Sequence, residues 1–344
     1  ALTVASGVPL GYNPPMSWNL LGHTWAENLL RTHIANNEAR HAYLFTGAPG
    51  VGRRSLALAF ASALNCTQPQ QPGDYCENCR ICRHTQRMQL PDLSVVAPES
   101  EGGSIKVAQV RELQRALSLT PYEARYRVAL LLNFQLANAS AQNALLKTLE
   151  EAPEKVILLL TADAADSLLP TIVSRCEVLR LRPLAVEALE DALLNRWQLA
   201  PQQARLLAHL SSGRPGMALQ MAQDQHLLEK RAAWVQELLR LLPANRYERF
   251  SACEALARNR DQLRLMLQVW LSFARDLLLT ASGSSEKIVN QDQLAEIERI
   301  AGGLPTRRPL EMVNTLITSL ENLEANANLR LLLDNTLLKI PQIN

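Results

Sequence analysis

The segment GAPGVGRRSL, residues 47–56, has the glycine spacing of a phosphate-binding loop. Gly47 and Gly52 stand at the ends of that spacing, and Gly50 lies between them. A loop of this type holds phosphates with backbone N–H groups, a lysine and a hydroxyl that binds magnesium. The apolar run AYLF before the loop and the run SLALAFASAL after it supply the strand and the helix that such a loop joins. We therefore expect the backbone of a phosphate site here.

Two arginines occupy the positions where this chemistry needs a lysine and a hydroxyl. Arg53 keeps a positive charge, but its planar guanidinium does not replace a compact ammonium. Arg54 has no lone pair for a cation, and Ser55 lies one residue late, turned by about 100° on a helix. We expect the glycines and Arg53 to form a degenerate loop that does not bind ATP productively. A plain glycine turn between a strand and a helix is the alternative interpretation.

Four of the six cysteines form a second candidate site; they are Cys66, Cys76, Cys79 and Cys82. Four thiolates fill a tetrahedral zinc site and leave no position for water, so we expect a structural Zn²⁺ within residues 66–82. The alternatives are an iron–sulfur cluster and reduced thiols without a metal, and His84 is a competing ligand. Cys176 and Cys253 stand alone and are expected to be buried small apolar residues.

Short apolar runs predict the sheet that positions these residues. Each run is nearly continuous in apolar character and is separated from the next by a segment long enough for a helical crossover, which is typical of buried parallel strands. The runs are residues 42–46, 92–98, 127–133, 156–162 and 176–184. The sequence therefore predicts an α/β domain over residues 17–183, with a parallel five-stranded sheet and helices on both faces.

No strand pattern follows Pro183, and the rest of the chain predicts an all-α half. The predicted helices are residues 185–196, 201–210, 216–222, 226–242, 247–257, 262–281, 291–301, 309–323 and 328–339. The segment PANRY, residues 243–247, is the expected boundary within this half. Residues 1–16 lack a periodic pattern and are expected to be a flexible lead-in.

Composition excludes several classes of protein. The chain has 344 residues, of which 47% are hydrophobic and 20% charged, as in globular proteins and unlike disordered ones. A net charge of +2 indicates no strong binding of nucleic acid through the global field. The apolar runs are far shorter than the roughly 20 residues that span a bilayer, and the first residues lack a signal-peptide pattern. We therefore expect a cytoplasmic protein.

Three stretches resemble the clamp-loader subunits of bacterial DNA polymerase III, a clade of the AAA+ superfamily. They are HAYLFTGAPGVG (41–52), NALLKTLEEAP (143–153) and LLPTIVSRCEVLRL (168–181), and they stand in the family's order. The resemblance runs from about Trp18 and extends weakly to NANLRLLLDNTLLKIP, residues 326–341. It implies an AAA+ domain that carries a zinc module.

The same resemblance implies the organisation of the helical half and the partners. Residues 184–242 are expected to form a small helical lid domain, and residues 243–344 a helical collar that packs against other subunits. The implied partners are the gamma/tau and delta subunits and, through the complex, the sliding clamp and primer-template DNA.

The resemblance also exposes further defects in an ATP site. The ATPases of the family end one strand with Asp-Glu, and the matching positions here are Leu132 and Asn133. A leucine does not hold a cation, and an asparagine does not act as a base. The ATPases also carry an arginine that reaches the γ-phosphate, where this sequence has Gly216, two residues after Arg214. The chain thus most resembles the family member that keeps the fold without hydrolysing ATP.

The segment SRC, residues 174–176, matches the family's arginine finger, which implies that Arg175 reaches into the ATP site of a neighbouring ATPase subunit. Such a cation stabilises charge in the transition state and accelerates hydrolysis by on the order of 10³ to 10⁵. We expect a structural stator of the DNA polymerase III holoenzyme without intrinsic ATPase activity. The alternatives are an ATP-hydrolysing motor similar to gamma or tau with a variant loop, a zinc-stabilised protein-binding module unrelated to replication and, for Arg175, an ordinary surface arginine.

Overall fold

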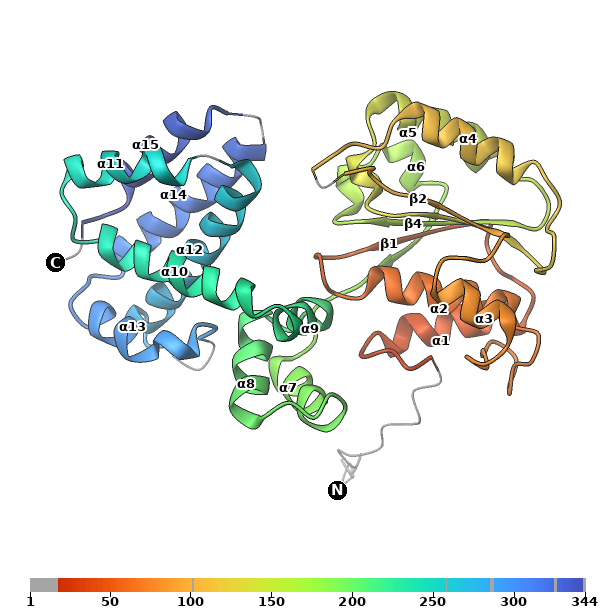
Figure 1. The fold of residues 1–344 in the computed structure, drawn as a ribbon, viewed down its shortest axis with the longest axis horizontal. Helices are drawn as coiled ribbons and strands as arrows, with labels where there is room; N and C mark the ends of the chain where they lie inside the picture. The colour runs from red at the N-terminus through yellow and green to blue at the C-terminus, as the bar shows by residue number, and fades with distance from the viewer. Residues whose placement is uncertain (1–17, 101, 258, 285–287, 325–326, 343–344) are drawn as a thin grey trace, which may run out of the picture. The chain divides into compact units, whose positions relative to one another are not determined.

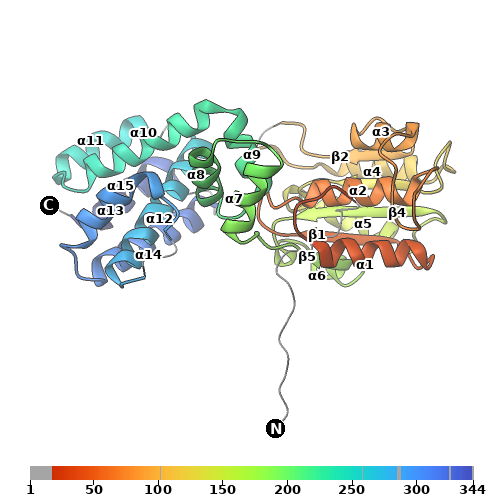
Figure 2. The ribbon, with the colours of Figure 1, turned by 90° about the horizontal axis from the view of Figure 1, so that it is seen from below.

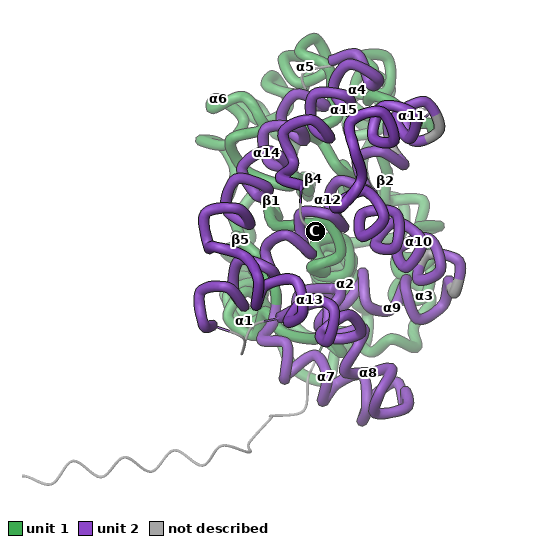
Figure 3. The backbone as a smooth tube through the Cα atoms, turned by 90° about the vertical axis from the view of Figure 1, so that its left-hand side faces the viewer, with its two compact units in different colours: residues 1–183 green, residues 184–344 purple. Residues whose placement is uncertain are grey.

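The computed structural model describes residues 18–100, 102–257, 259–284, 288–324 and 327–342. The lead-in expected over residues 1–16 lies outside these ranges. The chain divides into two compact units, residues 1–183 and 184–344 (Figure 3). Each unit is described by itself.

The first unit contains the predicted sheet. Its strands are β1 (Ala42–Thr46), β2 (Leu93–Val96), β3 (Arg127–Leu131), β4 (Val156–Ala162) and β5 (Glu177–Arg180). All strand pairs are parallel, and the order across the sheet is β2-β3-β4-β1-β5. Every residue of β1, β3 and β4 is buried, which accounts for their largely apolar character. The exceptions are Thr46, Arg127 and Thr161, which are polar or charged and buried. The predicted five strands are therefore confirmed.

Helices cover both faces of this sheet (Figure 1). On one face lie α1 (Thr24–Ala35), α2 (Arg53–Asn65) and α3 (Arg80–Gln86), and on the other lie α4 (Val107–Leu117), α5 (Ala139–Glu150) and α6 (Pro170–Val173). The 3₁₀ helices η1 (Phe134–Leu136) and η2 (Ala165–Ser167) follow β3 and β4. Successive residues of a strand point to opposite faces, so Tyr43 and Phe45 enter the core under α2 while Ala42 and Leu44 enter the core under α5.

The second unit contains helices and, among its described residues, no strand. Its helices are α7 (Val186–Asn195), α8 (Pro201–Leu210), α9 (Pro215–Gln223), α10 (Gln225–Leu241), α11 (Arg246–Leu256), α12 (Arg260–Ala281), α13 (Leu294–Ala301), α14 (Arg307–Glu324) and α15 (Leu329–Lys339), with the 3₁₀ helix η4 (Gln291–Gln293). The predicted helices are confirmed, although the segment predicted to begin at residue 291 begins as a 3₁₀ turn.

The core of the second unit surrounds α12, which packs against α10, α13 and α14 (Figures 1 and 2). Trp270, Phe273 and Leu277 of α12 are fully buried. Val235 and Leu238 of α10 belong to the same core. The division into a lid and a collar after residue 242 stays a prediction. Across the described helices of both units, none is long and apolar enough to cross a membrane.

Candidate functional site

The glycine-rich loop joins the carboxyl end of β1 to the first turn of α2. Gly47, Gly50 and Gly52 have φ angles of +147°, +82° and +108°, which residues with a side chain rarely adopt. At Gly47 a Cβ atom would lie 2.5 Å from the backbone oxygen of Leu181, the residue after β5. The backbone of the loop therefore requires these glycines, whether or not a ligand binds.

Arg53 is the first residue of α2, and its side chain bridges the ends of two neighbouring strands. Its Nη1 donates to Oδ1 of Asp163 at 2.7 Å, and its Nη2 donates to Oδ1 of Asn133 at 3.3 Å. Asp163 directly follows β4, and Asn133 lies two residues after β3. Only 7% of Arg53 is exposed. The charge that an ATPase would direct at a phosphate is directed here at a carboxylate of the chain itself.

The structure also places the other positions at which the sequence predicts defects in an ATP site. Leu132 packs against the core between the sheet and α2. Asn133 donates its backbone N–H to Oγ1 of Thr161 at 2.8 Å and gives its side-chain oxygen to Arg53. Arg54 and Ser55 are exposed. The predicted defects of the first unit thus lie after the carboxyl ends of β1 and β3, whereas Gly216 lies in the second unit.

Asp163 was absent from the sequence prediction, although a signal for it exists. It follows the apolar run of residues 156–162 without a gap. Because the carboxyl ends of parallel strands meet at one edge, a polar residue at that position lies beside the glycine-rich loop. The strand order places β4 between β1 and β3, and this order brings Asp163 within reach of Arg53. The sequence alone does not give that order.

A histidine that the sequence prediction also missed, directly before α1, supports the loop. Nε2 of His23 lies 2.9 Å from the backbone oxygen of Val51, to which the ring donates. Burial lowers the pKa of His23 below its ordinary value, and the hydrogen bond to Val51 offsets this only in part. The neutral ring therefore ties α1 to the loop without adding positive charge.

The second candidate site is the cysteine cluster at the end of α2. The sulfur atoms of Cys66, Cys76, Cys79 and Cys82 lie within 4.8 Å of one another. A tetrahedral zinc with bonds of about 2.3 Å needs sulfur atoms about 3.8 Å apart, so this donor set fits the metal. Backbone N–H groups donate to three of the sulfurs, as is suitable for thiolates: Gln68 and Cys76 to Cys66, Cys79 to Cys76, and Cys82 to Cys79.

His84 does not belong to this group of ligand atoms. Cys253 is fully buried, as predicted, whereas Cys176 is only partly buried. Burial still raises the pKa of both thiols to about 12, so they remain protonated at neutral pH.

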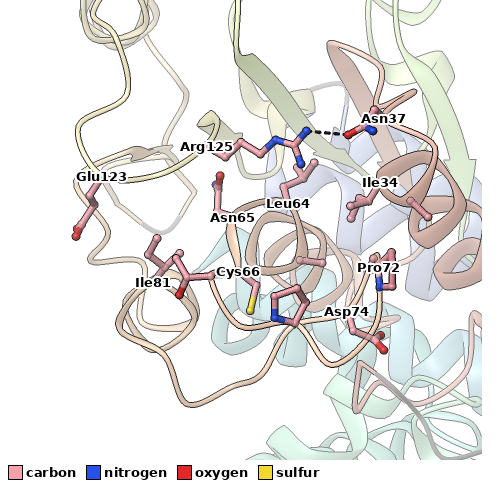
Figure 4. A pocket seen from close by; sticks show the side chains of 15 residues that line it. Ile34, Asn37, Leu64, Asn65, Cys66, Pro72, Asp74, Ile81, Glu123 and Arg125 are labelled. Atoms are coloured by element: carbon pink, nitrogen blue, oxygen red, sulfur yellow. Dashed lines mark hydrogen bonds between the residues drawn. The ribbon is translucent and has the colours of Figure 1, made fainter.

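A pocket of about 310 Å³ adjoins the cysteine cluster between the ends of α1 and α2 (Figure 4). Cys66 and Asn65 line it, together with Arg125 and Asp74. Nη2 of Arg125 donates to Oδ1 of Asn37 at 2.8 Å, and Asp74 pairs with Arg31 at 3.0 Å. These charged groups are therefore already engaged within the chain.

Arg175 lies two residues after α6, and 35% of its side chain is exposed. Its Nη2 lies 2.8 Å from Oε1 of Glu150, the last residue of α5, and its Nη1 donates to the backbone oxygen of Thr171 at 2.9 Å. In the second unit, Arg214 donates through Nε to the backbone oxygen of Ser211, and Gly216 has no side chain to offer a phosphate.

Comparison with known proteins identifies the family. Residues 22–185 match the family described as DNA polymerase III, delta subunit, and residues 225–342 match its C-terminal family. The delta' subunit of DNA polymerase III from Escherichia coli K12 is 30% identical over 317 residues, which cover 91% of this chain and 92% of that protein. The delta' subunit from Bacillus subtilis 168 is 28% identical over 318 residues, with 91% and 94% covered.

A solved gamma subunit-related protein of DNA polymerase III from Thermotoga maritima is 18% identical and superposes with a TM-score of 0.43, covering 86% of this chain and 99% of that one. The length and identity of the match to the E. coli delta' subunit establish the relationship. The parallel five-stranded sheet with helices on both faces and the helical second unit confirm the predicted fold class. The chain therefore belongs to the delta' subunit family of DNA polymerase III.

Proposed function

We propose that this chain is an ATPase-deficient stator of a clamp loader. In this role it supplies Arg175 in trans to the ATP site of a neighbouring ATPase subunit while the sliding clamp is loaded onto primed DNA. The observation that carries the proposal is the bridge from Arg53 to Asp163 and Asn133, which uses the loop's cation inside the chain.

The proposed lack of ATP hydrolysis rests on independent chemical deficiencies. Arg54 and Leu132 stand where an ATPase carries ligands for magnesium, and neither side chain has a lone pair for a cation. Asn133 stands where a carboxylate would orient the attacking water. A substitution that restored the ATPase residue at one of these positions would leave the other positions without the groups that hydrolysis needs.

The proposed finger rests on the exposure and the donor capacity of Arg175. A guanidinium has five N–H donors, and the hydrogen bonds described for Arg175 use two of them. The remaining donors are suited to phosphate oxygens, which guanidinium groups bind in a bidentate manner. An ATPase subunit that receives Arg175 would gain stabilisation of the charge that develops on the γ-phosphate.

The remaining features fit a structural subunit. Cys66, Cys76, Cys79 and Cys82 would hold a structural Zn²⁺, which has no open position for catalysis. We propose that residues 184–242 form a lid and residues 243–344 a collar that binds other subunits. The proposed direct partners are the gamma/tau and delta subunits. The sliding clamp and primer-template DNA are partners of the assembled complex.

The test uses the assembled clamp loader with Arg175→Ala and, as a matched control, Arg182→Ala, which removes another exposed arginine of the same unit. We expect Arg175→Ala to assemble but to reduce clamp loading and the ATPase rate that DNA and clamp stimulate, while Arg182→Ala does not. Unchanged rates with Arg175→Ala would contradict the finger.

A second measurement addresses the alternative of a motor similar to gamma or tau. We expect the isolated chain to show no ATP turnover with or without magnesium. Tight magnesium-dependent binding of ATP with turnover would favour the motor, with Arg53 in the role of the lysine.

A further inference from the structure

We propose that Glu150 is a positioning residue for Arg175, holding its guanidinium in the orientation in which it meets the neighbour's ATP. This inference rests on the proposed function, since it concerns the same arginine. It adds Glu150 to the residues of the proposed finger site. The motif SRC does not predict this residue, because Glu150 lies 25 positions earlier in the chain.

Contacts from two separate segments fix the plane of the guanidinium. Nη2 of Arg175 lies 2.8 Å from Oε1 of Glu150 at the end of α5, and Nη1 donates to the backbone oxygen of Thr171 in α6 at 2.9 Å. A single contact would leave the planar group free to turn about it. Two acceptors on different nitrogens remove that freedom, which is the form of pre-organisation that an in-trans catalytic group needs.

The backbone that carries Arg175 is held by the same helix. The buried Gln142 of α5 accepts from the backbone N–H of Leu169 at 3.0 Å and donates to the backbone oxygen of Ala137 at 3.1 Å. Leu168 and Ile172 are buried in the core between α5 and the sheet. Gln142 and the core thus fix the backbone of the segment that leads to Arg175. The contact with Glu150 then orients the long side chain of Arg175.

The exposure of the pair argues against a role in stability. The side chain of Glu150 is 51% exposed and that of Arg175 is 35% exposed. An exposed ion pair of this kind stabilises a fold little, because water screens the attraction and both long side chains lose freedom. Because the ion pair contributes little free energy, the guanidinium loses little stabilisation when it shares its N–H donors between Glu150 and a phosphate. The pair is therefore suited to orienting Arg175 without trapping it.

The test measures ATP hydrolysis by the assembled clamp loader with DNA and clamp present. We expect Glu150→Ala to lower kcat by about three- to tenfold and to leave KM for ATP within about twofold, because the finger acts on the transition state and the neighbour binds the nucleotide. Glu151→Ala is the matched control, since Glu151 is the next residue, is exposed and has no side-chain partner among the described residues. Glu150→Gln keeps an acceptor at the same place and should fall between Glu150→Ala and the unchanged protein.

The Arg175→Ala background separates positioning from a merely structural role. In that background Glu150→Ala should cause no further loss, and the melting temperature of the isolated chain should change by less than about 2 °C. Equal rates for Glu150→Ala and Glu151→Ala, with Arg175→Ala impaired, would overturn the role of Glu150 and leave the proposed function standing. A faster rate with Glu150→Ala would also overturn it, because Glu150 would then restrain the finger. If Arg175→Ala itself had no effect, the proposed function would fail and this inference with it.

Discussion

At the scale of single residues, the change from lysine to arginine in the glycine-rich loop has a structural consequence. A lysine presents one nitrogen, whereas the planar guanidinium of Arg53 donates from two nitrogens to Asp163 and Asn133 at once. The positive charge of the loop is thereby matched within the chain. The cation at the first position of α2 therefore has a structural role within the chain, where it joins the segments that follow β3 and β4.

A second arginine, Arg127, forms a buried ion pair with Asp92 at 3.1 Å. The carboxylate of Asp92 is fully buried and also accepts from the backbone N–H groups of Tyr122, Glu123 and Ala124. Burial by itself would raise the pKa of Asp92, but these three hydrogen bonds and the charge of Arg127 together lower it below the ordinary value. One carboxylate thus holds the loop before β3 in place.

We expect Asp92→Asn to lower the free energy of unfolding by about 3 kcal/mol at pH 7. The substitution removes the carboxylate that balances the buried charge of Arg127, and the backbone oxygens of Ala116 and Thr120, which still accept from the guanidinium, carry no full charge. A carboxyl with a lowered pKa in the folded state contributes stability above its unfolded pKa of about 3.9 and loses it as the pH falls through the folded pKa. The difference between Asp92→Asn and the unchanged protein should therefore shrink below about pH 4. Urea unfolding from pH 7 to pH 3 measures it, with the exposed Asp166→Asn as control. A difference that does not vary with pH would contradict this assignment.

At the scale of elements, α2 connects the two candidate sites. It begins at Arg53 beside the loop and ends at Asn65, directly before Cys66. The side chain of Asn65 donates to the backbone oxygen of Tyr126 at 3.1 Å and accepts from its N–H at 2.8 Å, which ties the end of the helix to the start of β3. The cysteine cluster then holds together the loop that joins α2 to α3, next to this anchored end of α2.

We expect Cys79→Ser to reduce bound zinc from about one equivalent to well below half, because a structural site needs all four thiolates. The sheet should persist, since its core contains many buried residues outside residues 66–82. Metal analysis by mass spectrometry measures the bound zinc. Hydrogen exchange along the chain tests whether the sheet persists, and we expect faster exchange only around the cluster. Cys176→Ser, outside the cluster, is the control and should retain zinc. Full occupancy in Cys79→Ser would show that the cluster is not the metal site.

At the scale of the whole molecule, the two units have separate cores. The sheet with its two helical layers forms the cores of residues 1–183, and the core around α12 lies within residues 184–344. A unit with its own closed core is expected to fold without the other.

We therefore expect fragments 18–183 and 184–344 to fold separately, each with one cooperative transition in urea followed by circular dichroism. A fragment that begins at residue 260 is the control, since it lacks α10 and α11, which contribute Val235, Leu238 and Cys253 to the core. We expect this fragment to unfold without a cooperative transition. Loss of cooperativity in either of the two larger fragments would contradict the independence of the units.

Local sequence patterns were sufficient to predict the five strands and the helices of the second unit. The runs at residues 42–46 and 156–162 match β1 and β4 at both ends, because strands that are buried on both faces form nearly continuous apolar runs. The helices α8 and α12 follow from apolar spacing in the same way. The inability of Arg54 and Leu132 to bind magnesium is also intrinsic to their side chains, and needs no coordinates.

Pairing between distant residues was decided only by the tertiary structure. Arg53 meets Asp163, 110 residues away, because β4 lies between β1 and β3, and the order β2-β3-β4-β1-β5 leaves no trace in the periodicity of any single strand. Glu150 meets Arg175 because α5 and α6 pack together on one face of the sheet. The sequence by itself determined which segments are buried strands and helices, which cysteines are spaced for a metal and which side chains lack lone pairs. The partners of Arg53 and Arg175 depended on the packing of the elements, because a local pattern records that a surface is buried but not which surface covers it.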